Sequence, residues 1–125
     1  MGKKKKTTSG SNRPRVKVWI SSDVDEGVFG DGKWRLLCAI EREGSLSAAA
    51  EDLGMSYRKA WGDLKKAEER LKISLIERHR GGKDGGKTVL TLRGKQWLDA
   101  YTKFKAEIDE SVAQAYSKYM GDLTE

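Results

Sequence analysis

The feature that most constrains the fold is a repeated pair of helix-ending and helix-starting residues. Gly44 is followed directly by Ser45, and Gly54 is followed two residues later by Ser56. Glycine readily takes the left-handed conformation that ends helices, and serine is a favoured capping residue at a helix start. Only about two turns of helix fit in residues 46–53. The spacing therefore predicts a short helix that is joined tightly to a helix on either side.

Both flanking helices have an apolar face. The first is expected to open at Gly32, to carry Leu36, Leu37 and Ile40, and to end at Gly44. The helix after Ser56 has apolar residues at helical spacing for the core: Tyr57, Ala60, Trp61, Leu64, Ala67 and Leu71. Its opposite face holds Arg58, Lys59, Gly62, Lys65 and Lys66. A short helix, a tight turn and a basic second helix together are typical of a helix-turn-helix.

A β-hairpin with a basic, glycine-rich loop is expected after the third helix. Residues 75–80 and 88–90 are predicted strands, and residues 81–87 are the loop between them. A hairpin in this position after a recognition helix is a wing. Thr91 is then placed to cap a last, long helix that starts at Leu92.

A smaller hairpin is expected ahead of the helices. Residues 16–20 alternate apolar and polar side chains, residues 22–27 supply turn chemistry, and residues 28–29 return as a second short strand. The fold class is therefore mainly α with a small β component. It comprises a disordered basic arm (1–14), a winged helix-turn-helix domain with an N-terminal β-hairpin (15–95) and a long dimerisation helix (92–125).

Charge is segregated along the 125 residues, whose formal net charge is +6. Residues 1–17 hold seven Lys or Arg and no acidic residue, and residues 56–95 hold twelve basic and five acidic residues. The segment between these two and the segment after them are both net acidic. Segregated positive charge suits a polyanion such as nucleic acid.

Candidate DNA contacts lie on the helix-turn-helix and the wing. Arg58 and Lys59, in the first turn of the third helix, are placed to reach base edges and phosphates. Arg78 and Arg80 share one strand face, which we expect to be turned toward DNA. The predicted DNA-binding set is Ser45, Ser47, Ser56, Tyr57, Arg58, Lys59, Lys65, Arg78, Arg80, Lys83 and Lys87. For two of these residues a structural role stays open beside DNA contact. Tyr57 can equally pack in the core, and helix capping alone is enough to explain Ser45.

The last helix carries one apolar stripe at spacings close to a heptad seam. Its members are Trp97, Tyr101, Phe104, Ile108, Val112, Ala115 and Tyr119, with Ser111 as an alternative to Val112. A stripe this long has no core left to face in a chain of this size. It therefore predicts a homodimer, whose two recognition helices would read a palindromic operator in double-stranded DNA.

Other classes of function have little support. The loop of residues 81–87 lacks the G-x-x-x-x-G-K-[ST] order of a nucleotide-binding loop. His79 and Cys38 are too few and too far apart for a metal site, and no partners for general base catalysis accompany His79. We expect no enzyme activity, no metal and no cofactor. No apolar run suits a membrane span and the N-terminus lacks a secretory signal, so the expected location is cytoplasmic.

The stretch from Gly32 to about Tyr101 resembles the N-terminal DNA-binding domain of ModE-type molybdate-responsive regulators, relatives of the LysR-type winged helix. The resemblance rests on residues 44–50 (GSLSAAA), 54–61 (GMSYRKAW), 77–86 (ERHRGGKDGG) and 90–91 (LT). Residues 28–32 (VFGDG) also fit members that carry an N-terminal hairpin. The resemblance implies a dimeric transcriptional regulator in which the long helix pairs the subunits.

Regulators of this type sense molybdate or tungstate in C-terminal domains, and this sequence stops at Glu125. We therefore expect no oxyanion effector to bind this chain, which is interpreted as either a stand-alone version or part of a longer protein. The favoured function is a sequence-specific transcriptional regulator. The alternative is a winged helix used for protein–protein interaction or as a non-specific architectural DNA-binding module.

Overall fold

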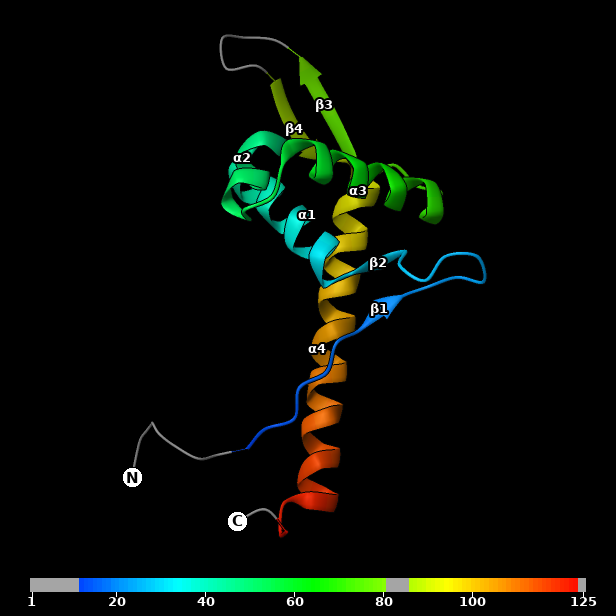
Figure 1. Ribbon diagram of the computed structural model, residues 1–125, viewed down its shortest axis with the longest axis vertical. Helices are drawn as coiled ribbons and strands as arrows, with labels where there is room; N and C mark the ends of the chain where they lie inside the picture. Colours follow the sequence, from blue (N-terminus) through cyan, green and yellow to red (C-terminus); the bar gives the residue numbers. More distant parts are fainter. Residues whose placement is uncertain (1–11, 81–85, 124–125) are drawn as a thin grey trace. The chain divides into compact units, whose positions relative to one another are not determined.

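The computed structural model describes residues 12–80 and 86–123, which belong to two compact units. One unit is Val18–Lys103, and the other combines residues 12–17 with residues 104–123. The elements, labelled in Figure 1, are β1 (Trp19–Ile20), β2 (Phe29–Gly30), α1 (Asp31–Glu43), α2 (Leu46–Asp52), α3 (Tyr57–Leu71), β3 (Ile76–Arg80), β4 (Gly86–Leu90) and α4 (Leu92–Met120).

The helix-turn-helix forms as its capping residues predict. Gly44 ends α1 with a φ of 81°, and its amide donates to the carbonyl oxygen of Ile40. The Ser45 hydroxyl accepts from the amide of Ala48 at the start of α2, at 3.0 Å. The Ser56 hydroxyl does the same at the start of α3. The predicted order of three helices is confirmed, with boundaries that differ by one residue at the start of α1 and the end of α2.

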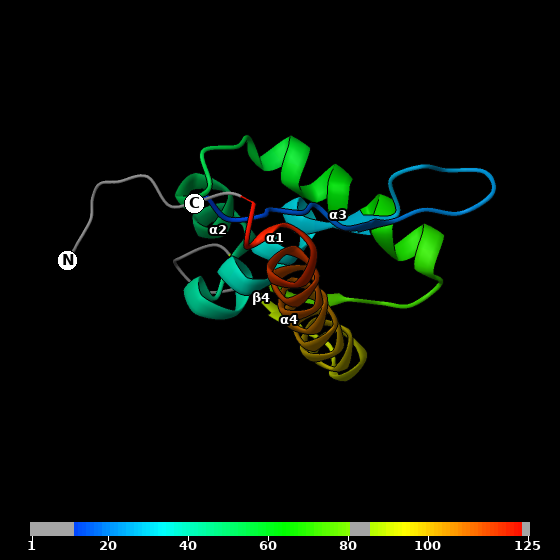
Figure 2. The same cartoon turned by 90° about the horizontal axis from the view of Figure 1, so that it is seen from below.

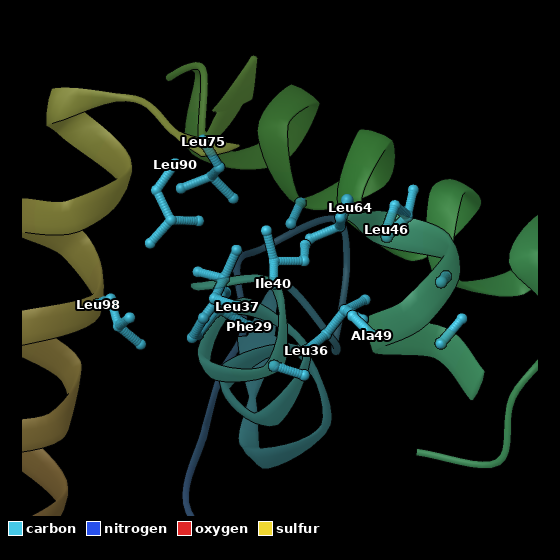
Figure 3. Close-up of a cluster of buried hydrophobic side chains, with 14 of the residues drawn as sticks. Phe29, Leu36, Leu37, Ile40, Leu46, Ala49, Leu64, Leu75, Leu90 and Leu98 are labelled. Carbon is cyan, nitrogen blue, oxygen red and sulfur yellow. The ribbon is translucent and has the colours of Figure 1, made fainter. Parts of the chain in front are cut away.

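The three helices, the base of the wing and the first turns of α4 share one core (Figure 3). In that view Leu75 and Leu90 lie above Leu98 of α4 and Leu37 of α1, near the start of α4. The largest fully buried side chains are Phe29, Leu36, Leu37, Ile40, Leu46, Leu64 and Leu75. Because every element of this unit contributes to one core, α3 and the wing hold fixed positions relative to each other.

The wing is a regular antiparallel hairpin in which Ile76 pairs with Leu90 and Arg80 with Gly86. Its second strand starts at Gly86, two residues earlier than the sequence predicts. The extra pairs place Lys87 in the strand opposite His79 rather than in the loop. Lys83, another predicted DNA contact, lies outside the described residues.

The N-terminal hairpin is shorter than predicted, with only two paired residues in each strand. Its turn is held by a hydrogen bond from the Ser22 amide to the carbonyl oxygen of Asp25, at 2.7 Å. Asp25 also accepts from Arg70 at 2.7 Å, so the turn lies beside the C-terminal end of α3, as both Figure 1 and Figure 2 show. Phe29 of β2 is fully buried.

The start of α4 packs on this hairpin. The Trp97 and Tyr101 rings meet the Phe29 ring edge to face, with centroids 5.4 and 5.0 Å apart. Tyr101 is only 3% exposed and donates to the carbonyl oxygen of Val18. Burial, together with the nearby Asp31 carboxylate, raises the pKa of Tyr101 to about 12.

The dimer stripe predicted from the sequence is therefore wrong at Tyr101, and Trp97 is half-buried in the same packing. The prediction assumed that no core was left for these positions. Phe29 supplies that core, because the N-terminal hairpin carries it against α4.

Among the described residues, no helix is long and apolar enough to cross a membrane.

Candidate nucleic-acid interface

The first turn of α3 presents three consecutive exposed residues. Ser56 caps the helix, and Tyr57, Arg58 and Lys59 follow it on the surface. Tyr57 is 44% exposed, so its predicted place in the core is wrong and the buried stripe of α3 starts at Ala60. Tyr57 is the first residue of α3 and lies one turn ahead of Ala60, where the buried stripe begins.

Two of the predicted basic contacts on α3 already hold intramolecular partners. The Lys59 ammonium lies 3.2 Å from the Asp63 carboxylate, and the Lys65 ammonium lies 3.1 Å from the Glu68 carboxylate. Arg58, in contrast, forms no ion pair with any residue that the structure describes. Exposed pairs are weak and exchange readily, so Lys59 and Lys65 keep some capacity for an anion. Among the cations at the start of α3, Arg58 is therefore the one for which no described carboxylate competes with an external anion.

Arg78 connects the wing to the recognition helix. Its guanidinium carbon lies 5.8 Å from the ring centroid of Tyr57 and 5.7 Å from that of Trp61. Arg78 pairs across the hairpin with buried Thr88, so the strand face it occupies is the one turned toward the helices. Arg78 nevertheless remains exposed as a residue. Cation–π contacts of this kind make α3 and the wing one continuous surface.

The wing has a second face, opposite Arg78. Glu77, His79 and Lys87 lie on the face opposite Arg78, and the His79 imidazole is 3.5 Å from the Glu77 carboxylate. Lys87 is exposed there. Arg80 is the last residue of β3, and its side chain lies outside the described residues.

Thr88 anchors the wing to the turn between α1 and α2. Its amide donates to the carbonyl oxygen of Gly44 at 3.0 Å, and its hydroxyl accepts from the amide of Leu46 at 3.3 Å. Ser45, in the same turn, is half-buried and engaged in capping, whereas Ser47 is exposed in the first turn of α2. The wing, the start of α2 and the start of α3 are therefore held together through backbone groups.

Sequence reasoning missed two residues that build this surface. One is Thr88, whose strand position gave no sign of a hydrogen bond to a helix start 42 residues away. The other is Glu68, whose carboxylate accepts from the amides of Leu75 and Ile76 at 2.8 and 3.2 Å and so fixes the start of the wing. In the sequence, Glu68 is one of several charged residues of this helix, and nothing marks it as an acceptor for the amides of the wing.

Replacing Thr88 with Val tests the anchor. The change keeps the side-chain shape but leaves the amide of Leu46 without its buried acceptor, which costs about 1–3 kcal/mol. Chemical denaturation should show this loss in the free energy of unfolding, and Thr88→Ser, which keeps the hydroxyl, should lose less. A Thr88→Val protein as stable as the unmodified chain would show that the hydrogen bond does not hold the wing.

The C-terminal end of α3 is electrostatically different from its start. The Asp25 carboxylate binds Arg70, and this hydrogen bond is the main reason that the pKa of Asp25 lies below its ordinary value, with the charge of Lys66 adding to it. The acidic hairpin turn thus offsets positive charge at this end. At the start of α3, in contrast, Arg58 forms no ion pair with a described residue.

Comparisons with known proteins agree with this geometry. Residues 32–95 match the family described as bacterial regulatory helix-turn-helix protein, lysR family. The chain is 40% identical over 88 residues to the molybdenum-pterin-binding protein MopB of Rhodobacter capsulatus, covering 70% of this chain and 31% of that protein. It is 32% identical over 88 residues to the DNA-binding transcriptional dual regulator ModE of Escherichia coli K12, covering 70% and 34%. The chain thus spans about a third of the length of these relatives.

Solved structures show the same fold. The CbnR DNA-binding domain, crystallised as a DNA complex, superposes with a TM-score of 0.55 at 20% identity, covering 70% of this chain and 94% of that one. Together with the three helices and wing described above, this likeness identifies the fold as a winged helix-turn-helix with a long C-terminal helix. The match over more than half of the sequence shows that the chain belongs to the lysR family of bacterial regulatory helix-turn-helix proteins.

Proposed function

We propose that this chain is the DNA-binding part of a transcriptional regulator that recognises a specific sequence. The observation that carries the proposal is the exposed basic start of α3, with Arg58 at its centre and Arg78 joining it to the wing. The names of a relative, a DNA-binding transcriptional regulator, and of a structural neighbour solved with DNA support it. The function is binding rather than catalysis, and its place of action is the cytoplasm.

Each part of the surface has a distinct role in the proposal. The start of α3 enters the major groove, where Arg58 reads base edges and Tyr57 donates to a phosphate. Ser47, which is exposed in the first turn of α2, binds the neighbouring backbone phosphate through its hydroxyl. The wing follows the sugar-phosphate edge with Lys87. Arg78 fixes the distance between α3 and the wing, because it belongs to the wing and contacts two rings of α3.

We further propose that the chain works as a homodimer on a palindromic operator. Tyr101 is the last buried residue of α4, yet the helix continues to Met120. Apolar residues continue along it at the predicted spacing, with Phe104 46% and Tyr119 68% exposed and Ile108 and Val112 half-buried. A second copy is the simplest partner for such a stripe, because most soluble oligomers are two-fold symmetric.

The dimer proposal predicts a change of mass. Ile108→Asp with Val112→Asp places two charges in the stripe, so sedimentation velocity at tens of micromolar should find monomers where the unmodified chain is a dimer. Ala106→Asp with Ala113→Asp adds the same charges to exposed positions off the stripe and should leave the dimer intact. Circular dichroism should show that all variants stay folded. An unmodified chain that sediments as a monomer would contradict the proposal.

The salt dependence of binding tests the function against the alternative of a protein-interaction module. The chain should bind a labelled 30-base-pair random-sequence duplex, and the logarithm of its affinity should fall linearly with the logarithm of salt concentration. The slope should be about −0.9 for each phosphate neutralised. A chain that binds no duplex even at low salt would show that this winged helix does not serve DNA.

A further inference from the structure

The segment before the N-terminal hairpin has a regular pattern of charge. Arg13, Arg15 and Lys17 occupy alternate positions, and Pro14 stands between the two arginines. This segment lies outside residues 32–95, which match the lysR family. It therefore adds a feature that the helix-turn-helix and the wing do not require.

The structure leaves these three side chains available. Arg13, Arg15 and Lys17 are exposed, and none of them forms an ion pair with a described residue. Residues 12–17 form neither helix nor strand. Proline fixes its own φ near −65° and disfavours a helical conformation in the residue before it. In an extended conformation alternate side chains lie on the same side, so this spacing suits binding of all three cations along one narrow groove.

We propose that residues 12–17, hereafter the arm, bind DNA in the minor groove, with a preference for A·T-rich sequence. The minor groove is about 6 Å wide, which admits an extended chain but not a helix. It is narrowest and most negative in A·T tracts, where arginine side chains are favoured. Arginine suits this groove better than lysine because its guanidinium is less strongly hydrated.

The proposal rests on the proposed function, since both elements must meet the same duplex. Once α3 is bound, the arm is tethered to DNA at a high effective concentration, so a weak groove contact adds measurably to the affinity.

The test uses the full chain and two 24-base-pair duplexes, one built of A·T tracts and one of G·C pairs. Fluorescence anisotropy gives the affinity of each over a series of salt concentrations. Arg13→Ala with Arg15→Ala should lower the affinity for the A·T duplex by about tenfold or more and reduce its salt slope by about two. The affinity for the G·C duplex should fall less. Arg13→Lys with Arg15→Lys should keep the slope but lose the A·T preference.

A matched control removes two exposed arginines from α1 and α4, Arg35→Ala with Arg93→Ala, and should leave the ratio of the two affinities unchanged. An equal loss on both duplexes in the arm variant would overturn the proposal, because it would make the arm a phosphate contact only. Unchanged affinities in the arm variant would overturn it as well. Failure of the unmodified chain to bind either duplex would instead contradict the proposed function itself.

Discussion

Gly94→Ala should destabilise the domain more than any other single methyl addition to its described glycines. A Cβ atom built at Gly94 lies 2.1 Å from the carbonyl oxygen of Leu75, which is backbone and therefore has little freedom to move. That oxygen also accepts the amide of Thr91 at 2.9 Å, so any shift weakens the junction between wing and α4. Overpacking of this kind, combined with a strained hydrogen bond, should lower the free energy of unfolding by about 3 kcal/mol or more.

Gly62→Ala is the matched control for this change. Gly62 is also a helical glycine, but nothing lies within 4 Å of the added Cβ. Alanine there should raise the free energy of unfolding by about 0.5–1 kcal/mol, because it restricts the unfolded chain and favours helix. Urea denaturation of both variants separates the two effects. If Gly94→Ala were as stable as Gly62→Ala, the close approach of α4 to the wing would not exist in solution.

Arg58→Ala should have the largest effect on DNA recognition. Arg58 is exposed in the first turn of α3 and forms no ion pair with a described residue. A bidentate arginine contact with guanine contributes about 1–3 kcal/mol of discrimination against the wrong base. The affinity for a duplex enriched from a random library should therefore fall by about tenfold to a hundredfold, while the affinity for a scrambled duplex should fall much less. Arg35→Ala, on α1, should change neither affinity selectively.

The local fold could be predicted from the sequence wherever capping residues mark it. Gly44, Ser45 and Ser56 each place a helix boundary through a backbone conformation or hydrogen bond that involves only neighbouring residues. Thr91 caps α4 in the same way, accepting from the amide of Gly94 at 2.8 Å. These short-range signals determine the order and length of the helices to within a residue or two.

Contacts between distant segments could not be predicted. Tyr101 has the same helical spacing as Phe104 and Ile108, and only the approach of Phe29 makes it a core residue rather than a dimer contact. Likewise, Arg78 has the charge of a phosphate contact, and nothing in its neighbours indicates that two rings of α3 lie beneath it. Periodicity identifies an apolar face but does not identify the surface that covers it.

The central claim is that the start of α3 reads sequence rather than charge alone, and one measurement tests it most directly. The unmodified chain and Arg58→Ala are titrated with the enriched duplex and its scrambled counterpart at one salt concentration. We expect the unmodified chain to prefer the enriched duplex strongly and Arg58→Ala to lose most of that preference while still binding both. Equal losses on the two duplexes would contradict the claim and reduce Arg58 to a phosphate contact.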